Sequence, residues 1–252
     1  MKPVIEALIA GGLSPAGGER VAEVRVGLGY TAVTLESGRA GVGAMLRYML
    51  EADGCSILPY AGTLGGRDAA ELVPLLRSPG IVETSIGLAA VNALFEPHGR
   101  EGLSTGDPVG LLGIRPGDRV AMVGNMAPVV ERIRRIGGEC VVFDDGRAGE
   151  EGITETSLEE DLLPGCDVVV LSATSLLNKT FDRLVELSAG AREICVMGAS
   201  TPLAPDVFRP RGVTLLSGRR FTDPGRLLRV VGEAGGTKSF GPISLKVNIP
   251  LR

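Results

Sequence analysis

Residues 119–146 read RVAMVGNMAPVVERIRRIGGECVVFDDG, and this stretch decides the fold class. It contains an apolar strand at 119–123, an amphipathic helix at 128–136 that ends at Gly137-Gly138, and a second apolar strand at 139–144. Such alternation predicts βαβ units and a parallel sheet. The pattern continues towards the C-terminus with strands predicted at 167–171, 193–197 and 212–216 and helices predicted at 180–188 and 224–233.

The N-terminal third has a different pattern, typical of an α+β unit that begins with a helix. Two β-rich runs at 21–28 and 31–35 surround Gly29-Tyr30, which predicts a hairpin. Residues 41–52 read as a helix. The segment Asp68-Ala69-Ala70-Glu71 is a D-x-x-E variant of the capping box and predicts the start of another helix.

Residues 83–95 form a further predicted helix, which Pro97 terminates. Its glycine and alanines predict close packing, either against the other domain or against another subunit. A homo-oligomer is therefore left open.

A linker is predicted at residues 96–106, because this segment is polar and glycine-rich and has no periodicity. Asp107-Pro108 then supplies an N-cap and a first-turn proline for a short helix that reaches about residue 114. The sequence thus predicts an α/β protein with an α+β domain at 1–95 and a Rossmann-like domain at 107–252, in which helices flank a parallel sheet.

Composition excludes several classes of partner. The chain has 252 residues, 44% hydrophobic content, a formal net charge of −4 and no cluster of Lys and Arg, which argues against nucleic-acid binding. Glu6 interrupts the first apolar run, so the N-terminus is a poor match to a signal peptide. No apolar span reaches the roughly 18 residues of a membrane helix. We expect a cytoplasmic protein without a membrane partner.

The cysteines and the single histidine argue against a preformed zinc site. Cys55, Cys140, Cys166 and Cys195 are far apart, and His98 lies in the predicted linker. Cys140 and Cys195 fall inside predicted strands, where a free cysteine behaves as a small hydrophobic residue.

Amide and lysine residues are unusually rare, which makes the remaining ones informative. The chain has no Gln, four Asn and four Lys against 22 Arg, a usage that resembles a heat-adapted or GC-rich background. In an open parallel sheet, ligands bind beyond the carboxyl ends of the strands. Two of the asparagines, Asn125 and Asn178, and one lysine, Lys179, follow predicted strands at this rim.

Gly124 stands where the first glycine of a dinucleotide fingerprint would lie, and Asp144 follows at a spacing suited to a ribose hydroxyl. The remaining glycines of the fingerprint are absent, and Asn125 and Pro128 occupy this turn instead. The sequence therefore argues against NAD as the cofactor. A glycine that only turns the strand into the helix is the alternative interpretation of Gly124.

The segment Asn178-Lys179-Thr180 precedes a predicted helix and is the sharpest local signal. Thr180 can cap this helix, while Lys179 and free backbone N–H groups would favour an anion. If the protein is an enzyme, Lys179 is the predicted catalytic group, since a desolvated lysine can lose its proton or stabilise negative charge. A capped helix with a solvated lysine explains the segment equally well.

Two further segments supply candidate binding residues. Gly198-Ala199-Ser200-Thr201-Pro202 offers hydroxyl and N–H groups that suit a carboxylate or phosphate, although a structural turn is an equal alternative. In the first domain, Glu83 and Asn92 either face the cleft or serve capping and packing.

Four stretches together resemble a known family, the putative heavy-metal chelation family, preceded by its usual partner domain with an enolase-N-terminal-like fold. The stretches are Ser85 to Ala93, Val120 to Asn125 with Pro128, Thr174 with Asn178-Lys179-Thr180, and Gly198 to Pro205. The resemblance covers nearly the whole chain. It implies an α+β domain packed on a Rossmann-like domain, an interdomain site, and metal handling through a metal ion or a metal-chelating metabolite.

We therefore expect a small-molecule-binding protein or enzyme that acts on an anionic or metal-chelating metabolite. The predicted ligand-binding residues are Glu83, Asn92, Gly124, Asn125, Asp144, Thr174, Asn178, Thr180, Gly198, Ser200 and Thr201, with Lys179 as the catalytic candidate. One alternative is a non-catalytic carrier that holds metal through Asp144, Asp145 or cysteines. The other is a nucleotide- or S-adenosylmethionine-dependent transferase.

Overall fold

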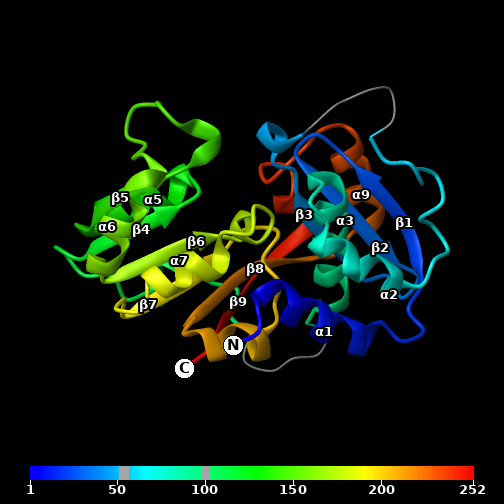
Figure 1. Ribbon diagram of the computed structural model, residues 1–252, viewed down its shortest axis with the longest axis horizontal. Helices are drawn as coiled ribbons and strands as arrows, with labels where there is room; N and C mark the ends of the chain where they lie inside the picture. Colours follow the sequence, from blue (N-terminus) through cyan, green and yellow to red (C-terminus); the bar gives the residue numbers. More distant parts are fainter. Residues whose placement is uncertain (51–56, 98–102) are drawn as a thin grey trace.

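The chain forms two β-sheets, one from each end of the sequence, with helices packed around both (Figure 1). The computed structural model describes residues 1–50, 57–97 and 103–252. Cys55, His98 and most of the predicted linker lie outside these ranges. The α/β fold class predicted from the sequence is confirmed.

The first sheet is antiparallel and has three strands, β1 (Val21–Val26), β2 (Tyr30–Leu35) and β3 (Ala40–Ala44), in that order. β1 and β2 form the predicted hairpin. The prediction of a helix at 41–52 was wrong for the described residues, because residues 40–44 pair with β2 and a 3₁₀ turn, η1 (Arg47–Met49), follows; residues 51 and 52 lie outside the described ranges. The Gly-Val-Gly sequence of β3 is a poor helix former, and pairing with β2 supplies its backbone partners.

Helix α3 (Ile81–Leu94) packs on one face of this sheet at backbone distance. A methyl group on Gly41 would overlap the backbone of Ala89 and Ala93, and one on Gly43 would overlap the Ser85 carbonyl oxygen. The Ser85 hydroxyl donates a hydrogen bond of 3.1 Å to the Gly43 carbonyl oxygen. The close packing predicted for this helix therefore requires glycine in β3.

The opposite face of the first sheet is covered by α9 (Pro224–Gly232), which comes from the C-terminal part of the chain. Ala32 and Val42 of the sheet share a core with Leu227 and Val231 of α9 and with Phe240. The first sheet is thus enclosed between α3 and α9 (Figure 1). The division of the chain near 96–106 stays a prediction. Residues 103–106 lie against the last strand: the Ser104 N–H donates to the Asn248 carbonyl oxygen, and the Asn248 side-chain amide donates to the Gly106 carbonyl oxygen.

The second sheet has six strands in the order β5-β4-β6-β7-β8-β9. The first five in this order are parallel and β9 is antiparallel. The bounds are β4 (Arg119–Val123), β5 (Glu139–Phe143), β6 (Val168–Ser172), β7 (Glu193–Met197), β8 (Leu215–Phe221) and β9 (Ser244–Pro250). The order places the topological switch point between β4 and β6, where a doubly wound sheet binds its ligand.

Four of the five predicted parallel strands occur within about one residue of the predicted bounds. The fifth, β8, begins and ends later than predicted. It begins later because a 3₁₀ turn ends at Gly212, with φ +82°, just before the strand. β9 was not predicted from the sequence. It is an edge strand that pairs along all of β8, and its buried and exposed residues do not alternate regularly.

Short helices complete the fold. The capping box predicted at Asp68 is confirmed, since its side chain accepts from the Ala70 N–H and the Glu71 side chain accepts from the Asp68 N–H. No helix among the described residues is long and apolar enough to span a membrane. The remaining helices are α1 (Val4–Ala16), α2 (Ala69–Leu72), α4 (Pro108–Leu111), α5 (Ala127–Ile136), α6 (Glu159–Leu162), α7 (Phe181–Leu187) and α8 (Pro205–Phe208).

We predict that Gly43→Ala lowers the free energy of unfolding by about 3 kcal/mol, because the added methyl group forces α3 away from the sheet. The measurement is urea unfolding followed by circular dichroism. Gly110→Ala is the matched control, since an added methyl group there has no atom within 4 Å and alanine favours the α4 helix. Equal midpoints for the two variants would contradict the close packing of α3 on β3.

Candidate functional site

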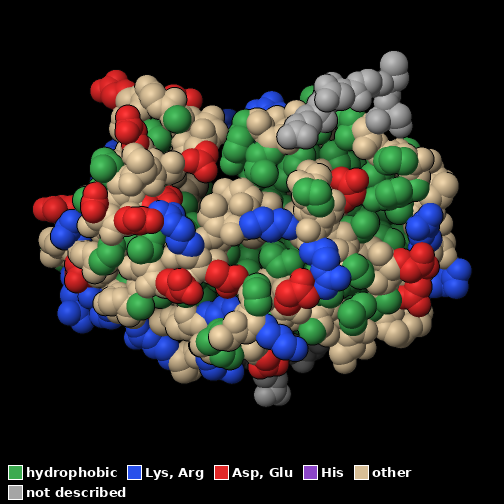
Figure 2. Space-filling view, viewed as in Figure 1, with side chains coloured by type: hydrophobic (Ala, Val, Ile, Leu, Met, Phe, Trp, Pro, Cys, Tyr) green, Lys and Arg blue, Asp and Glu red, His purple; other side chains and the backbone are tan. Residues whose placement is uncertain are grey.

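A cavity of about 650 Å³ lies at the carboxyl ends of β4, β5, β6 and β7. Residues of the first sheet and of η1 form its opposite wall, and Figure 2 shows a hollow where the two parts of the molecule meet. The lining residues are Tyr30, Leu46, Tyr48, Val123, Gly124, Asn125, Met126, Phe143, Asp144, Asp145, Thr156, Ser157, Glu159, Ser172, Thr174, Ser175, Asn178, Thr180, Arg183, Gly198, Ala199 and Thr237.

The floor of the cavity is the switch point of the sheet, where β4 and β6 end side by side. Gly124 has φ +89°, and a Cβ atom at this position would overlap the Cβ of Ser172. The Ser172 hydroxyl oxygen accepts hydrogen bonds from the N–H and hydroxyl of Thr174, at 3.3 and 2.8 Å. Glycine is therefore needed here to let the two strand ends meet beneath the cavity.

Asp144 connects the ends of β4 and β5. One carboxylate oxygen accepts from the Asn125 N–H at 2.7 Å, and the other accepts from the Gly146 N–H at 3.0 Å. The negative charge favoured near the N-terminus of α5 is thus supplied by the protein itself. Asp144 shapes the cavity wall, and both of its oxygens already hold backbone amides.

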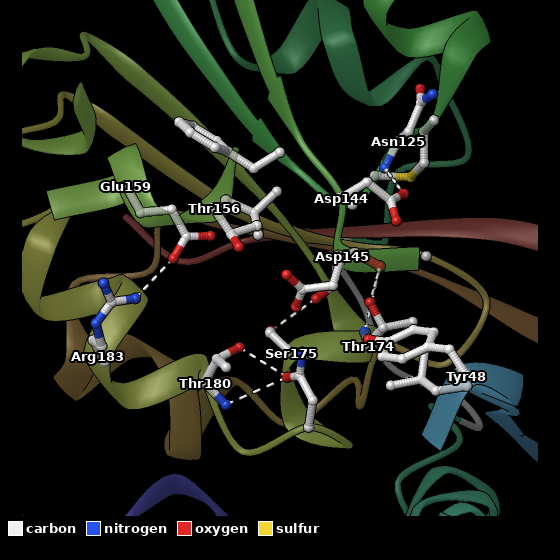
Figure 3. A pocket seen from close by; sticks show the side chains of 18 of the residues that line it. Tyr48, Asn125, Asp144, Asp145, Thr156, Glu159, Thr174, Ser175, Thr180 and Arg183 are labelled. Atoms are coloured by element: carbon white, nitrogen blue, oxygen red, sulfur yellow. Dashed lines mark hydrogen bonds and ion pairs between the residues drawn. The ribbon is translucent and has the colours of Figure 1, made fainter. Parts of the chain in front are cut away.

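The β6–α7 loop contributes amide and hydroxyl groups. The Asn178 side-chain oxygen accepts a hydrogen bond of 2.8 Å from the Thr180 hydroxyl. The prediction that Thr180 caps α7 was wrong: its side chain makes no capping hydrogen bond because the hydroxyl faces Asn178 instead. Both residues line the cavity, and Figure 3 shows Thr180 on its wall.

Tyr48 of η1 reaches across the cavity from the first sheet, and its side chain hydrogen-bonds to Asn178. Burial raises the pKa of the Tyr48 phenol, the Asp145 and Asp144 carboxylates raise it further, and the Asn178 hydrogen bond opposes the rise. Tyr48 was not among the predicted site residues, since η1 falls in the segment interpreted as a helix.

Glu159 and Arg183 form an ion pair on the opposite side of the cavity (Figure 3). The Arg183 guanidinium donates to Glu159 at 2.7 Å and to Glu160 at 3.1 Å, and Glu159 is only 5% exposed. Burial raises the pKa of the Glu159 carboxyl, Arg183 opposes this rise, and Asp145 adds to it. Neither residue follows a strand directly, so the search of strand ends could not find them.

Lys179 is adjacent to the cavity in sequence and is not among the residues that line it. Its backbone has φ +64°, and its ammonium group donates hydrogen bonds of 2.8 and 3.2 Å to the carbonyl oxygens of Leu76 and Ser78. Partial burial lowers the pKa of this ammonium group. Lys179 thus connects the β6–α7 loop to the end of the 3₁₀ helix η2 (Val73–Arg77).

Four other predicted residues lie outside the cavity lining, and three of them, Asn92, Ser200 and Thr201, lie where α3 meets the β7 loop. The Asn92 amide donates to the Val42 and Ser200 carbonyl oxygens at 2.7 and 2.9 Å. The side-chain oxygens of Asn92, Ser200 and Thr201 are buried and lack a hydrogen-bond partner within the described residues. Glu83, at the start of α3, is close enough to Tyr60 to raise the pKa of that phenol.

The donor set does not fit a metal ion bound directly by side chains. Among the described residues, no group of three or more His, Cys, Asp or Glu residues is placed to hold one. Asp144 accepts two amides and Glu159 pairs with Arg183. Cys195 is buried inside β7, and burial raises the pKa of its thiol.

Known proteins share this architecture. Two family models described as putative heavy-metal chelation match the chain, one over residues 7–95 and the other, DUF364, over 107–249. A curated protein of Methanocaldococcus jannaschii, named only as uncharacterized, is 26% identical over 242 residues, which cover 90% of this chain and 88% of that protein.

Two crystal structures of DUF364 family proteins of unknown function are similar along their whole length. The protein from Pyrococcus horikoshii has a TM-score of 0.85 at 23% identity, and the match covers 98% of this chain and 99% of that one. The protein from Desulfitobacterium hafniense has a TM-score of 0.80 at 26% identity, with 97% and 99% covered.

We predict that Lys179→Met lowers the free energy of unfolding by about 1 kcal/mol, because two carbonyl oxygens lose a charged donor. Urea unfolding measures the loss, and the exposed Lys238→Met is the control. A midpoint equal to that of the control would contradict the structural contact of Lys179.

A second prediction concerns the electrostatics of the cavity. Tyr48 titrates above its ordinary value, and its pKa is lower in Asp145→Asn than in the wild type, because the variant removes a negative charge that disfavours the phenolate. The measurement is NMR titration of ¹³C-labelled tyrosine, with Tyr48→Phe to assign the resonance. An unchanged or higher pKa in Asp145→Asn would show that the two side chains do not face each other.

Proposed function

The chain belongs to the putative heavy-metal chelation family, as the resemblance of its sequence indicates, and we propose that it binds a small polar metabolite in the cavity between its two sheets. The observation that carries this proposal is the position of the cavity. It lies at the switch point of a doubly wound sheet, and side chains from the first sheet close its other side.

The proposed ligand contacts come from groups that line the cavity and keep unused hydrogen-bonding capacity. The Asn178 amide nitrogen has two N–H groups, of which the hydrogen bond to Tyr48 uses one, and Thr174 and Thr180 present hydroxyl oxygens. Asn125 and the Gly198 backbone complete the polar wall. Gly124 and Asp144 fix the shape of this wall through their contacts with Ser172 and with the Asn125 N–H.

The remaining predicted site residues support the cavity from outside in this proposal. The Asn92 amide on α3 joins β3 to the Ser200 carbonyl oxygen in the β7 loop, and Lys179 attaches the β6–α7 loop to η2. The interpretation of an anionic ligand depended mainly on Lys179, and also on the loop from Gly198 to Pro202. Because the Lys179 ammonium group is bound to two carbonyl oxygens, that interpretation loses its main support.

The family description concerns heavy metals, and the donor set of the described residues does not fit a directly bound ion. In our proposal a metal therefore reaches this protein only as the complex of a small organic chelator, whose own donor atoms fill the coordination sphere. The residues of the cavity then recognise the organic part of the ligand.

We predict that compounds which stabilise the wild type in a thermal-shift screen of metabolites lose this effect on Thr156→Trp. Thr156 lines the cavity and makes no side-chain hydrogen bond, so an indole there occupies the binding space without breaking a contact. A ligand at about 100 times its Kd stabilises the native state by roughly 2.7 kcal/mol, which the screen detects readily.

The exposed Thr105→Trp is the matched control. The proposal requires it to respond as the wild type does. Equal shifts in all three proteins would place the binding site elsewhere, and the absence of any stabilising metabolite would count against a small-molecule function.

A further inference from the structure

The charges that face the cavity are mostly negative. Asp144, Asp145 and Glu159 contribute three carboxylates, and Arg183 contributes the single cationic group among the described lining residues. The formal charge of the lining is therefore negative, although the expectation from the sequence was an anionic or metal-chelating metabolite.

The nearby cations are already used by the protein. Both terminal nitrogens of Arg183 are bound to carboxylates, Glu159 at 2.7 Å and Glu160 at 3.1 Å. The Lys179 ammonium group is directed to the Leu76 and Ser78 carbonyl oxygens. Among the described residues, an anionic ligand would thus meet no lining cation that is free to pair with it.

The helix N-terminus at the cavity is also compensated. α5 begins at Ala127, and the Asn125 N–H, in the turn that precedes this helix, donates to the Asp144 carboxylate at 2.7 Å. A helix N-terminus attracts an anion when its N–H groups are open. Here a side chain of the protein supplies that anion, so the feature adds no preference for an anionic ligand.

Asp145 is the carboxylate that remains available. Its side chain makes no hydrogen bond or ion pair within the described residues, and its charge acts on both Tyr48 and Glu159. Asp145 therefore lies between Tyr48 and the ion pair of Glu159 and Arg183, as Figure 3 shows.

The wall opposite the carboxylates is apolar and aromatic, with Tyr30, Leu46 and Tyr48 contributed by the first sheet and η1. Aromatic faces attract cations and pack against flat organic groups. The cavity is thus negative on one side and aromatic on the other.

We infer that the cavity selects an organic cation, a molecule with a flat or apolar body that packs on Tyr48 and a positively charged group that pairs with Asp145. This inference rests on the proposed function, since it assigns the charge of the ligand in the same cavity. It also extends to a metal chelator, because a metal complex of net positive charge would pair with the same carboxylate.

The test uses three probes of one shape, benzamidine, benzamide and benzoate, which carry a positive, a neutral and a negative head group. Each is titrated into ¹⁵N-labelled full-length protein, and the Kd is obtained from amide chemical shifts. We expect benzamidine to bind about tenfold more tightly than benzoate, with benzamide between them, and the shifts to centre on Gly124, Asn178 and Gly198.

Two variants separate a local charge effect from the overall negative charge of the chain. Asp145→Asn reduces the preference for benzamidine about threefold or more, because it removes the available carboxylate. Asp206→Asn is the matched control, since this carboxylate is 89% exposed and lies outside the cavity lining, and it leaves the preference unchanged.

The outcomes distinguish the inference from the function on which it rests. Benzoate binding as tightly as benzamidine, with shifts at the cavity residues, overturns the cationic ligand and upholds the binding site. Equal loss of preference in both variants also overturns the inference. No shift at the cavity residues with any of the three probes contradicts both the inference and the proposed function.

Discussion

The contact between helix α3 and the glycines of β3 is the constraint on which the rest of the structure depends. Because Gly41 and Gly43 lack side chains, the α3 backbone rests directly on the sheet, and the Ser85 hydroxyl can reach the Gly43 carbonyl oxygen. The same helix carries Asn92, whose amide joins the free edge of β3 to the loop after β7. One packing contact thus sets how the first sheet lies against the second, and with it the width of the cavity between them.

The polar residues at the ends of the parallel strands divide into those that build the cavity and those that face it. Asp144 and Lys179 have the charges expected of ligand-binding groups, yet their hydrogen bonds go to backbone atoms of neighbouring segments. Such contacts satisfy backbone groups that would otherwise be left without partners where loops meet. The Asp145 carboxylate has no such partner among the described residues, and this difference supports a cavity with negative character.

Much of the fold could be predicted from the sequence because its signals are local. Buried parallel strands are short apolar runs, and Asp68 and Glu71 form a capping box at the expected spacing. β3 could not be recognised from the sequence, because its glycines are required by the close approach of α3, a helix about 45 residues away in sequence. The strand-end principle located the polar rim and Asn178. It missed Tyr48, Glu159 and Arg183, which reach the cavity from segments whose positions depend on tertiary packing.

The most direct measurement of the central claim, that the cavity between the sheets binds a small molecule, is a crystal structure of the protein as purified, with data collected above the absorption edges of transition metals. The account predicts ordered density between Tyr48 and the ends of β4 and β6, and any anomalous peak there to be ligated by atoms of the bound molecule. Collapse of Tyr48 onto the strand ends, or a metal ion held by side chains of the protein, would contradict it.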